Sequence, residues 1–194
     1  MDDTYKKINI TVWPKYQLNY WGITKCANSA IKSSLAGKTI KNIHKRDKSL
    51  HSSENVTYIS QEAALTNNYT NFTVTRDPYD RFISLYKDFG CDRFKSIGLD
   101  SSVSFDFFLD YVLEKFPNDN CNIHFKSQCS FITQDNKLLF EKVFSMPQAV
   151  KFLKRKGIEV NKANVSKDQE ITLSDANKQK IYDRYKNDFI LLGY

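Results

Sequence analysis

Short extended runs of apolar residues alternate along this chain with stretches in which apolar side chains recur every three or four positions. The extended runs are rich in aromatic and β-branched residues and cover residues 17–22, 56–59, 72–75 and 138–144. Helical spacing marks five further segments, residues 30–35, 78–89, 104–116, 145–156 and 175–185. Because alternating strands and helices are typical of α/β proteins, the pattern predicts an α/β fold with a mainly parallel sheet.

Local signals support the starts of two of these helices. Asp77 stands where an N-cap residue is expected, Pro78 occupies the first helical position, and Asp80 lies in the first turn. Ser145 and Gln148 have the spacing of a capping box. No stretch is rich enough in Pro or Gly to be a linker and no repeat is visible, so we expect a single domain over residues 1–194.

Composition indicates a globular protein with an anionic partner. Hydrophobic residues make up 41% of the chain, including 14 Phe and 11 Tyr, which is enough for a sizeable core. Lys and Arg exceed Asp and Glu by 29 to 22, and the net charge of +7 favours a nucleic acid, a nucleotide, or a sulfated or acidic glycan. No apolar run reaches the roughly 18 residues that span a bilayer, and residues 1–4 do not resemble a signal peptide. We therefore expect a soluble protein that is not secreted.

The glycines and cysteines exclude two classes of site. None of the six glycines has the spacing of G-x-G-x-x-G or G-x-x-x-x-G-K-[ST], while Gly37 and Gly157 stand where helices should end. The four cysteines show no C-x-x-C spacing and no histidine at zinc-finger spacing, so we expect no metal site. Reduced thiols are expected, and a disulfide between Cys121 and Cys129 stays open if the protein meets an oxidising compartment.

The segment after the first expected strand has the composition of an anion-binding turn. Small side chains let backbone N–H groups approach a phosphate, the following helix N-terminus adds partial positive charge, and a lysine adds a full one. The alternative is a plain turn with an exposed lysine. The residues concerned are Lys25, Cys26, Ala27, Asn28, Ser29 and Ala30.

A second candidate segment joins the strand at residues 72–75 to the helix that follows. Only six of the 29 basic residues are arginines, yet Arg76 and Arg81 both fall at this helix start. Ser84 follows two turns into the helix, on the face opposite its apolar residues. A guanidinium fork and a hydroxyl on one side suit a phosphate monoester, whereas the alternative has Arg76 paired with a carboxylate.

Together the two segments resemble the sulfotransferases that use 3′-phosphoadenosine 5′-phosphosulfate (PAPS). The pattern is a strand, Lys25 and small residues, followed by Arg-Asp-Pro-x-x-Arg-x-x-Ser-x-Tyr over residues 76–86. The resemblance is greatest to the Golgi-type carbohydrate sulfotransferases and their bacterial relatives. It extends over residues 17–194, because three further segments also resemble the family, residues 122–128, 164–167 and 185–194.

This resemblance implies a fold, a donor and roles for individual residues. The implied fold is a three-layer sandwich like that of the P-loop NTPases, with helices flanking a mainly parallel sheet. PAPS would be the sulfuryl donor, with Lys25 and residues 26–30 around its 5′-phosphosulfate. Arg76 and Ser84 would bind the 3′-phosphate, and Ser166 and Lys167 would lie near the nucleotide. Asp77 and Arg81 are expected to be structural.

The implied reaction is in-line transfer of a sulfuryl group to an acceptor hydroxyl, which needs a cation and a base. Lys25 is the expected cation beside the leaving phosphate oxygen. For the base we favour His124, with His51, His44 and Glu62 as alternatives. We also expect substrate contacts from His51, Glu62 and Gln128.

Two other functions remain as alternatives at this point. A small kinase-like phosphotransferase would share the nucleotide-binding fold, but it should carry the glycine-rich loop that is missing here. A noncatalytic basic module would bind nucleic acid or acidic glycan, yet the aromatic residues fall at core spacing and not between basic ones, so we expect no nucleic-acid partner. The resemblance implies a carbohydrate hydroxyl as acceptor. Because the sequence shows no membrane anchor, we expect a cytoplasmic protein of bacterial or viral source, with an excised Golgi luminal domain as the alternative.

Overall fold

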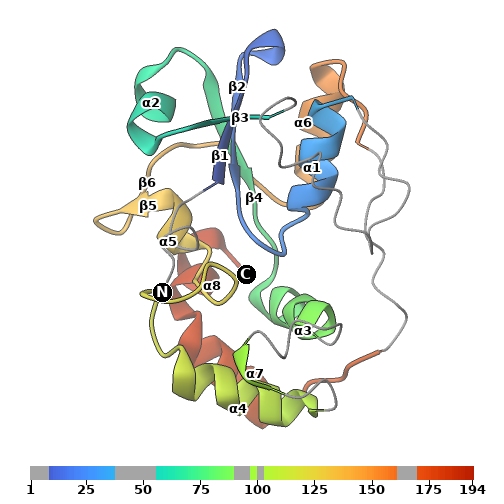
Figure 1. Ribbon diagram of the computed structural model, residues 1–194, viewed down its shortest axis with the longest axis vertical. Helices are drawn as coiled ribbons and strands as arrows, with labels where there is room; N and C mark the ends of the chain where they lie inside the picture. The colour runs from blue at the N-terminus through green and yellow to red at the C-terminus, as the bar shows by residue number, and fades with distance from the viewer. Residues whose placement is uncertain (1–8, 38–55, 90–96, 100–102, 161–169) are drawn as a thin grey trace. The chain divides into compact units, whose positions relative to one another are not determined.

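The computed structural model describes residues 9–37, 56–89, 97–99, 103–160 and 170–194 (Figure 1). These residues fall into two compact units, and each is described by itself. We call the first the sheet unit and the second the helical unit; the single domain over the whole chain remains a prediction. Of the described residues, those within 9–75 and 131–160 form the sheet unit, and those within 76–130 and 170–194 form the helical unit.

A five-stranded sheet forms the centre of the sheet unit. Its order is β3-β1-β2-β4-β7, in which β4 pairs in parallel with β2 and with β7, whereas β1 pairs antiparallel with β2 and with β3. The predicted α/β class is confirmed, but the sheet is mixed and not mainly parallel. The strands are β1 (Asn9–Trp13), β2 (Leu18–Gly22), β3 (Thr57–Ile59), β4 (Thr70–Val74) and β7 (Val143–Phe144).

The antiparallel half exists because β1 returns directly into β2. A short 3-10 turn, η2 (Pro14–Tyr16), joins the two strands, and a connection of this length permits only an antiparallel pair. Sequence analysis predicted β2, β3 and β4 but no strand at β1. The run at residues 138–144 is extended only at its ends, at β6 (Lys137–Leu138) and β7.

Successive side chains of β2 point to opposite faces of the sheet, and the two faces contact different helices. Leu18 and Tyr20 lie in an apolar core with Ile31 of α1 (Asn28–Leu35) and Leu153 of α6 (Met146–Arg155). Asn19 points to the other face, where its amide nitrogen donates to the Ala64 carbonyl at 3.0 Å in α2 (Gln61–Thr66). Helices therefore cover both faces of the sheet (Figure 1).

The ends of α1 and α6 follow the local signals. Gly37 and Gly157 have φ values of 64° and 74° just after these helices, as expected for glycines that end a helix. The capping box of Ser145 and Gln148 is present at the start of α6. A two-residue turn at Asp135 and Asn136, both with positive φ, closes the small hairpin of β5 (Thr133–Gln134) and β6.

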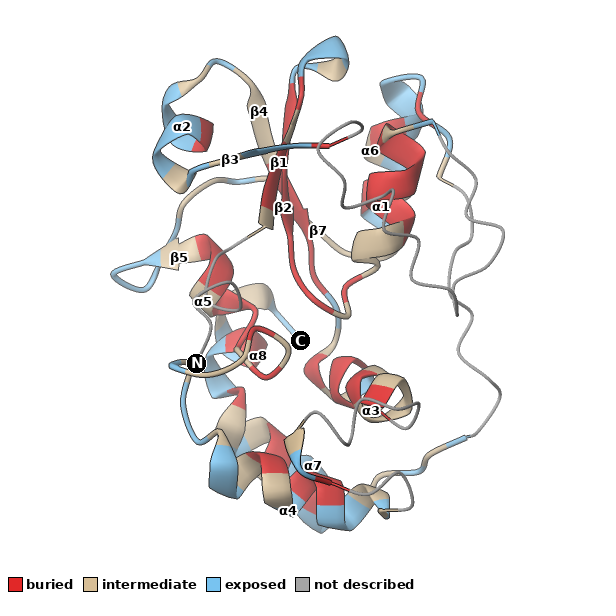
Figure 2. Cartoon of the chain, in the orientation of Figure 1, coloured by how far each residue is buried: buried red, intermediate tan, exposed pale blue. Residues whose placement is uncertain are grey.

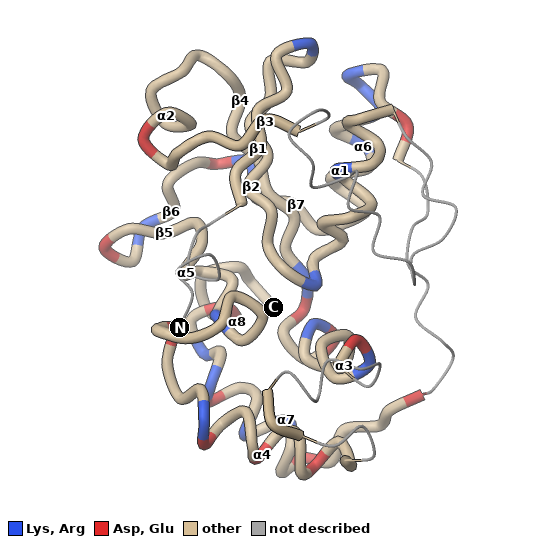
Figure 3. The backbone as a smooth tube through the Cα atoms, viewed as in Figure 1, with Lys and Arg blue, Asp and Glu red and all other residues tan. Residues whose placement is uncertain are grey.

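Aromatic packing holds the helical unit together. Phe82 and Phe89 of α3 contact Phe108 of α4, and Phe125 stacks on Phe116 with ring centroids 4.4 Å apart. The apolar faces of the helices are buried in this core (Figure 2), while acidic and basic residues are interspersed along the helices (Figure 3). The helices of this unit are α3 (Pro78–Phe89), α4 (Phe105–Lys115), α7 (Asp175–Arg184) and α8 (Lys186–Leu192). The boundary between the two units falls within α5 (Cys129–Ile132).

None of the helices within the described ranges is long and apolar enough to cross a membrane.

Candidate functional site

The loop that follows β2 has a backbone that is normally associated with glycine. Lys25 and Ala27 both adopt left-handed conformations, with φ of 64° and 56°. The backbone turns again at Cys26, whose N–H bonds to the Ile23 carbonyl at 3.3 Å. Alternating left-handed residues of this kind turn successive N–H groups to one side, which is how backbone concavities bind anions.

The start of α1 carries backbone N–H donors that suit such an anion. Its N-cap is Ala27, and no side chain among the described residues makes a capping hydrogen bond there. By contrast, the serine hydroxyls at positions 60, 104 and 174 cap α2, α4 and α7. The first N–H groups of any helix have no partner within it, so this uncapped start favours an anion bound there.

A close approach between Gly22 and Asn28 holds the loop against the end of β2. A Cβ atom on Gly22 would lie only 2.6 Å from Asn28 Oδ1, so no larger residue fits there without movement. Asn28 Oδ1 is buried and has no hydrogen-bond partner in the part of the chain that the structure describes. The close approach therefore requires glycine at position 22, before the loop, whereas the left-handed positions within the loop are occupied by Lys25 and Ala27.

Replacing Ala27 with glycine should stabilise the protein. The left-handed conformation costs a residue with a Cβ atom about 1 kcal/mol, and glycine adopts it freely. We expect urea denaturation to show a free energy of unfolding about 1 kcal/mol higher. Ala30→Gly is the matched control, because Ala30 is helical and glycine there should destabilise by a similar amount. Destabilisation of the same size by both changes would contradict this account of the loop.

In the helical unit, Arg76, Asp80 and Ser84 are spaced four residues apart and so line one side of the start of α3. The Arg76 Nε atom lies 4.0 Å from Asp80 Oδ2, and both side chains are exposed, so the ion pair is weak. Ser84 is half-buried. Arg76 thus pairs with a carboxylate, as the alternative interpretation of the sequence predicted, but this pairing with Asp80 leaves the guanidinium accessible to solvent.

Asp77 and Arg81 have the structural positions expected of them. Asp77 Oδ1 accepts hydrogen bonds from the N–H groups of Tyr79 and Asp80 at 2.8 and 3.1 Å, which caps α3. Arg81 is buried, and its guanidinium lies over the ring of Tyr185 at 5.8 Å. Neither side chain is placed to serve as an exposed phosphate ligand.

His124 has its tautomer set by its neighbour Asn122. Asn122 Oδ1 accepts the backbone N–H of His124 at 3.0 Å, which orients the amide, and the same oxygen lies 2.8 Å from His124 Nδ1. In the neutral ring, an oxygen that faces Nδ1 favours the proton on that nitrogen and leaves the lone pair on Nε2. A general base needs this tautomer. The ring also contacts Phe89 edge-to-face at 5.9 Å.

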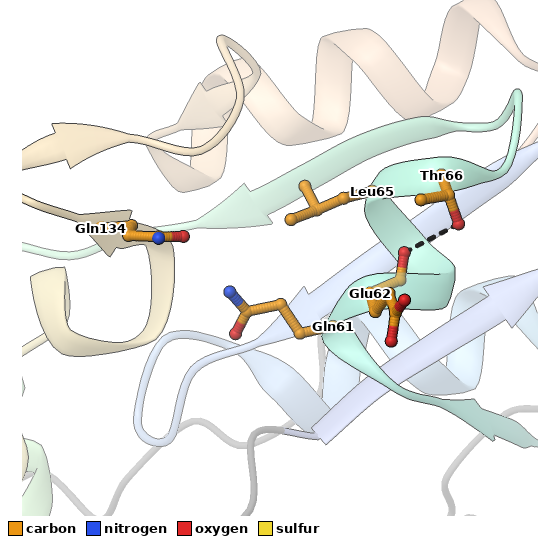
Figure 4. A pocket seen from close by; sticks show the side chains of 5 residues that line it. All are labelled: Gln61, Glu62, Leu65, Thr66 and Gln134. Carbon is orange, nitrogen blue, oxygen red and sulfur yellow. Dashed lines mark hydrogen bonds between the residues drawn. The ribbon is translucent and has the colours of Figure 1, made fainter.

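The candidate substrate residues are spread between the two units. Gln128 is buried in the helical unit and bonds to the main chain of Arg76. Glu62 is exposed on α2 of the sheet unit and lines a shallow pocket with Gln61, Leu65, Thr66 and Gln134 (Figure 4). His44, His51, Ser166 and Lys167 lie outside the described residues.

Sequence reasoning missed three residues that hold the segment carrying His124 and Gln128. Asp119 accepts hydrogen bonds from the N–H and the hydroxyl of Ser127, and Arg184 Nη2 donates to Asp119 Oδ1 at 3.2 Å. Asp188 accepts the N–H groups of Gln128 and Cys129. The charges of these three residues were visible in the sequence, but Arg184 lies 65 positions from Asp119, and Asp188 lies 60 positions from Gln128.

Three of the four cysteines, Cys26, Cys121 and Cys129, lie in the described part of the chain, and no disulfide joins them. Cys121 and Cys129 form no disulfide, and burial raises the pKa of both thiols. The nearby Asp188 raises the pKa of Cys129 further. No cluster of three or more His, Cys, Asp or Glu side chains that could hold a metal ion occurs within the described ranges.

Comparison with known proteins gives the family. The profile of the sulfotransferase family matches residues 9–194, a range that includes both candidate segments. Neither the search of curated proteins nor the search of solved structures finds a match. The predicted resemblance to sulfotransferases is confirmed by a match over almost the whole length, and this chain therefore belongs to the sulfotransferase family.

Proposed function

We propose that this protein transfers a sulfuryl group from PAPS to a hydroxyl group of a carbohydrate acceptor. The family match supports sulfuryl transfer in general. The observation that carries the choice of donor is the loop after β2, in which left-handed Lys25 and Ala27 lead into an uncapped helix. A loop of this shape suits a doubly anionic phosphosulfate better than a neutral ligand.

By the family resemblance, each of the two units would bind one end of the donor. In the sheet unit, Lys25 and the backbone of residues 26–30 would bind the 5′-phosphosulfate. In the helical unit, the accessible guanidinium of Arg76 and the hydroxyl of Ser84 would bind the 3′-phosphate. Ser166 and Lys167 are proposed to lie near the nucleotide on the resemblance alone.

Two side chains are proposed to act on the reacting groups. PAPS supplies an activated sulfuryl group, and negative charge develops on its leaving phosphate oxygen during transfer. Lys25 would stabilise that charge. His124 would accept the acceptor's proton at Nε2, which the hydrogen bond of Nδ1 to Asn122 leaves unprotonated.

The fold class of the P-loop NTPases is part of the proposal. In that class a phosphate loop follows the carboxyl end of a parallel strand. Here β2, β4 and β7 are consecutive parallel strands, and the Lys25 loop follows β2 directly. The antiparallel strands β1 and β3 extend the sheet on the other side of β2.

The two alternative functions have less support. A kinase-like phosphotransferase would be expected to use a glycine-rich loop. The loop after β2 contains no glycine, and its left-handed positions are Lys25 and Ala27. A basic nucleic-acid-binding module would gather its Lys and Arg residues on one face. The described basic residues are instead interspersed with acidic ones, as in the ion pair of Lys180 with Asp110 (Figure 3).

Calorimetric titration separates these functions. We expect adenosine 3′,5′-bisphosphate to bind tightly, while ATP and a random oligonucleotide bind weakly or not at all. An assay of sulfuryl transfer from PAPS to a panel of carbohydrates then tests the acceptor. Absence of bisphosphate binding would overturn the proposal, and transfer only to non-carbohydrate hydroxyls would overturn its acceptor.

Replacing Arg76 with alanine should weaken binding of adenosine 3′,5′-bisphosphate by about 2 kcal/mol, or roughly thirtyfold, because a charge-assisted hydrogen-bond pair is lost. Adenosine 5′-phosphosulfate, which has no 3′-phosphate, should bind the variant as it binds the original protein. Calorimetry with both nucleotides measures the difference. Arg155→Ala is the control, because Arg155 is exposed at the end of α6. Equal weakening of both nucleotides would refute the role of Arg76.

A further inference from the structure

Gln128 holds the main chain of Arg76 from both sides. Its Nε2 atom donates to the Arg76 carbonyl at 2.8 Å, and its Oε1 atom accepts the Arg76 N–H at 2.9 Å. Gln128 is fully buried. One side-chain amide thus satisfies the donor and the acceptor of a single residue, as a neighbouring strand would.

Arg76 needs such a partner because of its place in the chain. It follows the end of β4 at Val74 and precedes the first residue of α3, Pro78. Its peptide groups are therefore outside the ladder of the sheet and outside the hydrogen-bond pattern of the helix. Without the side chain of Gln128, the N–H and the carbonyl of Arg76 would lose these hydrogen bonds. Leaving such main-chain groups without a partner costs stability.

Gln128 is itself held by a buried carboxylate. Asp188 of α8 is fully buried, and its two oxygens accept the N–H groups of Gln128 and Cys129, each at 2.8 Å. A carboxylate that accepts two main-chain N–H groups restricts the segment at the start of α5. The connection therefore runs from Asp188 through Gln128 to the main chain of Arg76.

Within the described part of the chain, the Arg76 side chain has only a weak ion pair to orient it. Its guanidinium is exposed, and its contact with Asp80 is at 4.0 Å. The direction in which this side chain leaves the backbone therefore depends on the main chain that Gln128 holds. Misplacement of a binding group by about 1 Å can cost as much as a hundredfold in function.

We propose that Gln128 is a positioning residue for the 3′-phosphate, which aims Arg76 by fixing its main chain, and that Asp188 keeps Gln128 in place. This inference rests on the proposed role of Arg76. It gives Gln128 a part in donor binding, which is separate from the substrate contact expected from the sequence.

Two variants of Gln128 test the proposal, each titrated with adenosine 3′,5′-bisphosphate and adenosine 5′-phosphosulfate. Gln128→Leu removes both hydrogen bonds, and we expect it to bind the bisphosphate about tenfold more weakly with unchanged affinity for the phosphosulfate. Gln128→Glu should restore binding as the pH falls, because a protonated carboxyl again offers one donor and one acceptor. At each pH, the affinity of Gln128→Glu for adenosine 3′,5′-bisphosphate is measured relative to that of the original protein.

Asn177→Leu is the matched control. Asn177 is a buried amide of the same unit that donates to Asp106 Oδ1 at 2.6 Å and does not contact Arg76. We expect this variant to lose stability in urea denaturation while keeping the ratio of the two nucleotide affinities. Equal weakening of both nucleotides by Gln128→Leu would show a merely structural role and overturn the proposal.

The remaining outcomes are also decisive. If Gln128→Leu fails to fold, the pH series of Gln128→Glu decides, and a ratio that does not change with pH overturns the proposal. If Arg76→Ala leaves bisphosphate binding unchanged, the proposed role of Arg76 fails. If Arg76→Ala weakens binding but Gln128→Leu does not, only the positioning role of Gln128 fails.

Discussion

Replacing Lys25 with alanine should lower the rate of sulfuryl transfer by two to three orders of magnitude. Loss of one preorganised donor beside a developing negative charge typically raises the barrier by about 3 to 4 kcal/mol. Adenosine 3′,5′-bisphosphate keeps its other proposed ligands, Arg76, Ser84 and the backbone N–H groups of the loop, so we expect its affinity to fall far less than the rate. A fall in kcat much larger than the loss of nucleotide affinity is therefore the expected result.

Alanine is a suitable replacement because it keeps the backbone of the loop comparable. Lys25 has a φ of 64°, and alanine meets the same steric cost there, whereas glycine would also relieve strain. Lys15→Ala is the matched control, since Lys15 is an exposed lysine of the same unit in the turn before β2. Transfer at the original rate by Lys25→Ala would show that another group stabilises the leaving oxygen.

Replacing Lys32 with methionine should raise the free energy of unfolding at pH 7 by about 3 kcal/mol. Lys32 lies on α1 and is fully buried, with its ammonium 3.4 Å from the hydroxyl of Tyr58 and 5.0 Å from the centroid of that ring. Burial lowers the pKa of Lys32 from 10.5 to about 8, because the charged form loses its hydration. Methionine has a similar length and no charge to bury.

The extra stability of the Lys32→Met variant should disappear as the pH rises. Since the pKa of Lys32 is lower in the folded protein than in the unfolded chain, the folded state binds fewer protons between about pH 8 and 10.5. The original protein is therefore stabilised through this range relative to the methionine variant. Urea denaturation at several pH values measures the difference between the two proteins.

Lys151→Met provides the comparison for Lys32, because Lys151 is exposed on α6. We expect no difference that depends on pH between this control and the original protein. A constant difference for Lys32→Met from pH 7 to pH 10 would mean that Lys32 remains charged in the folded protein throughout.

Features that depend on neighbours in sequence could be predicted. Asp77 and Pro78 start α3 as expected, and Ser145 with Gln148 starts α6, because a cap is a contact between residues two or three positions apart. The turn expected before α1 is also present, at residues 24–27, while its binding of an anion stays a prediction. Strand β1 was missed because its short apolar run becomes a strand only through pairing with β2 and β3.

The sequence by itself determined the approximate bounds of five helices, α1, α3, α4, α6 and α7, as well as the two candidate segments and their resemblance to sulfotransferases. The tertiary structure alone decided the antiparallel half of the sheet, the left-handed backbone at Lys25 and Ala27, and the burial of Lys32. It also decided the contact of Gln128 with Arg76, which lies 52 positions away. The physical reason is that propensities and caps act over a few residues, whereas burial and long-range hydrogen bonds depend on which distant segments pack together.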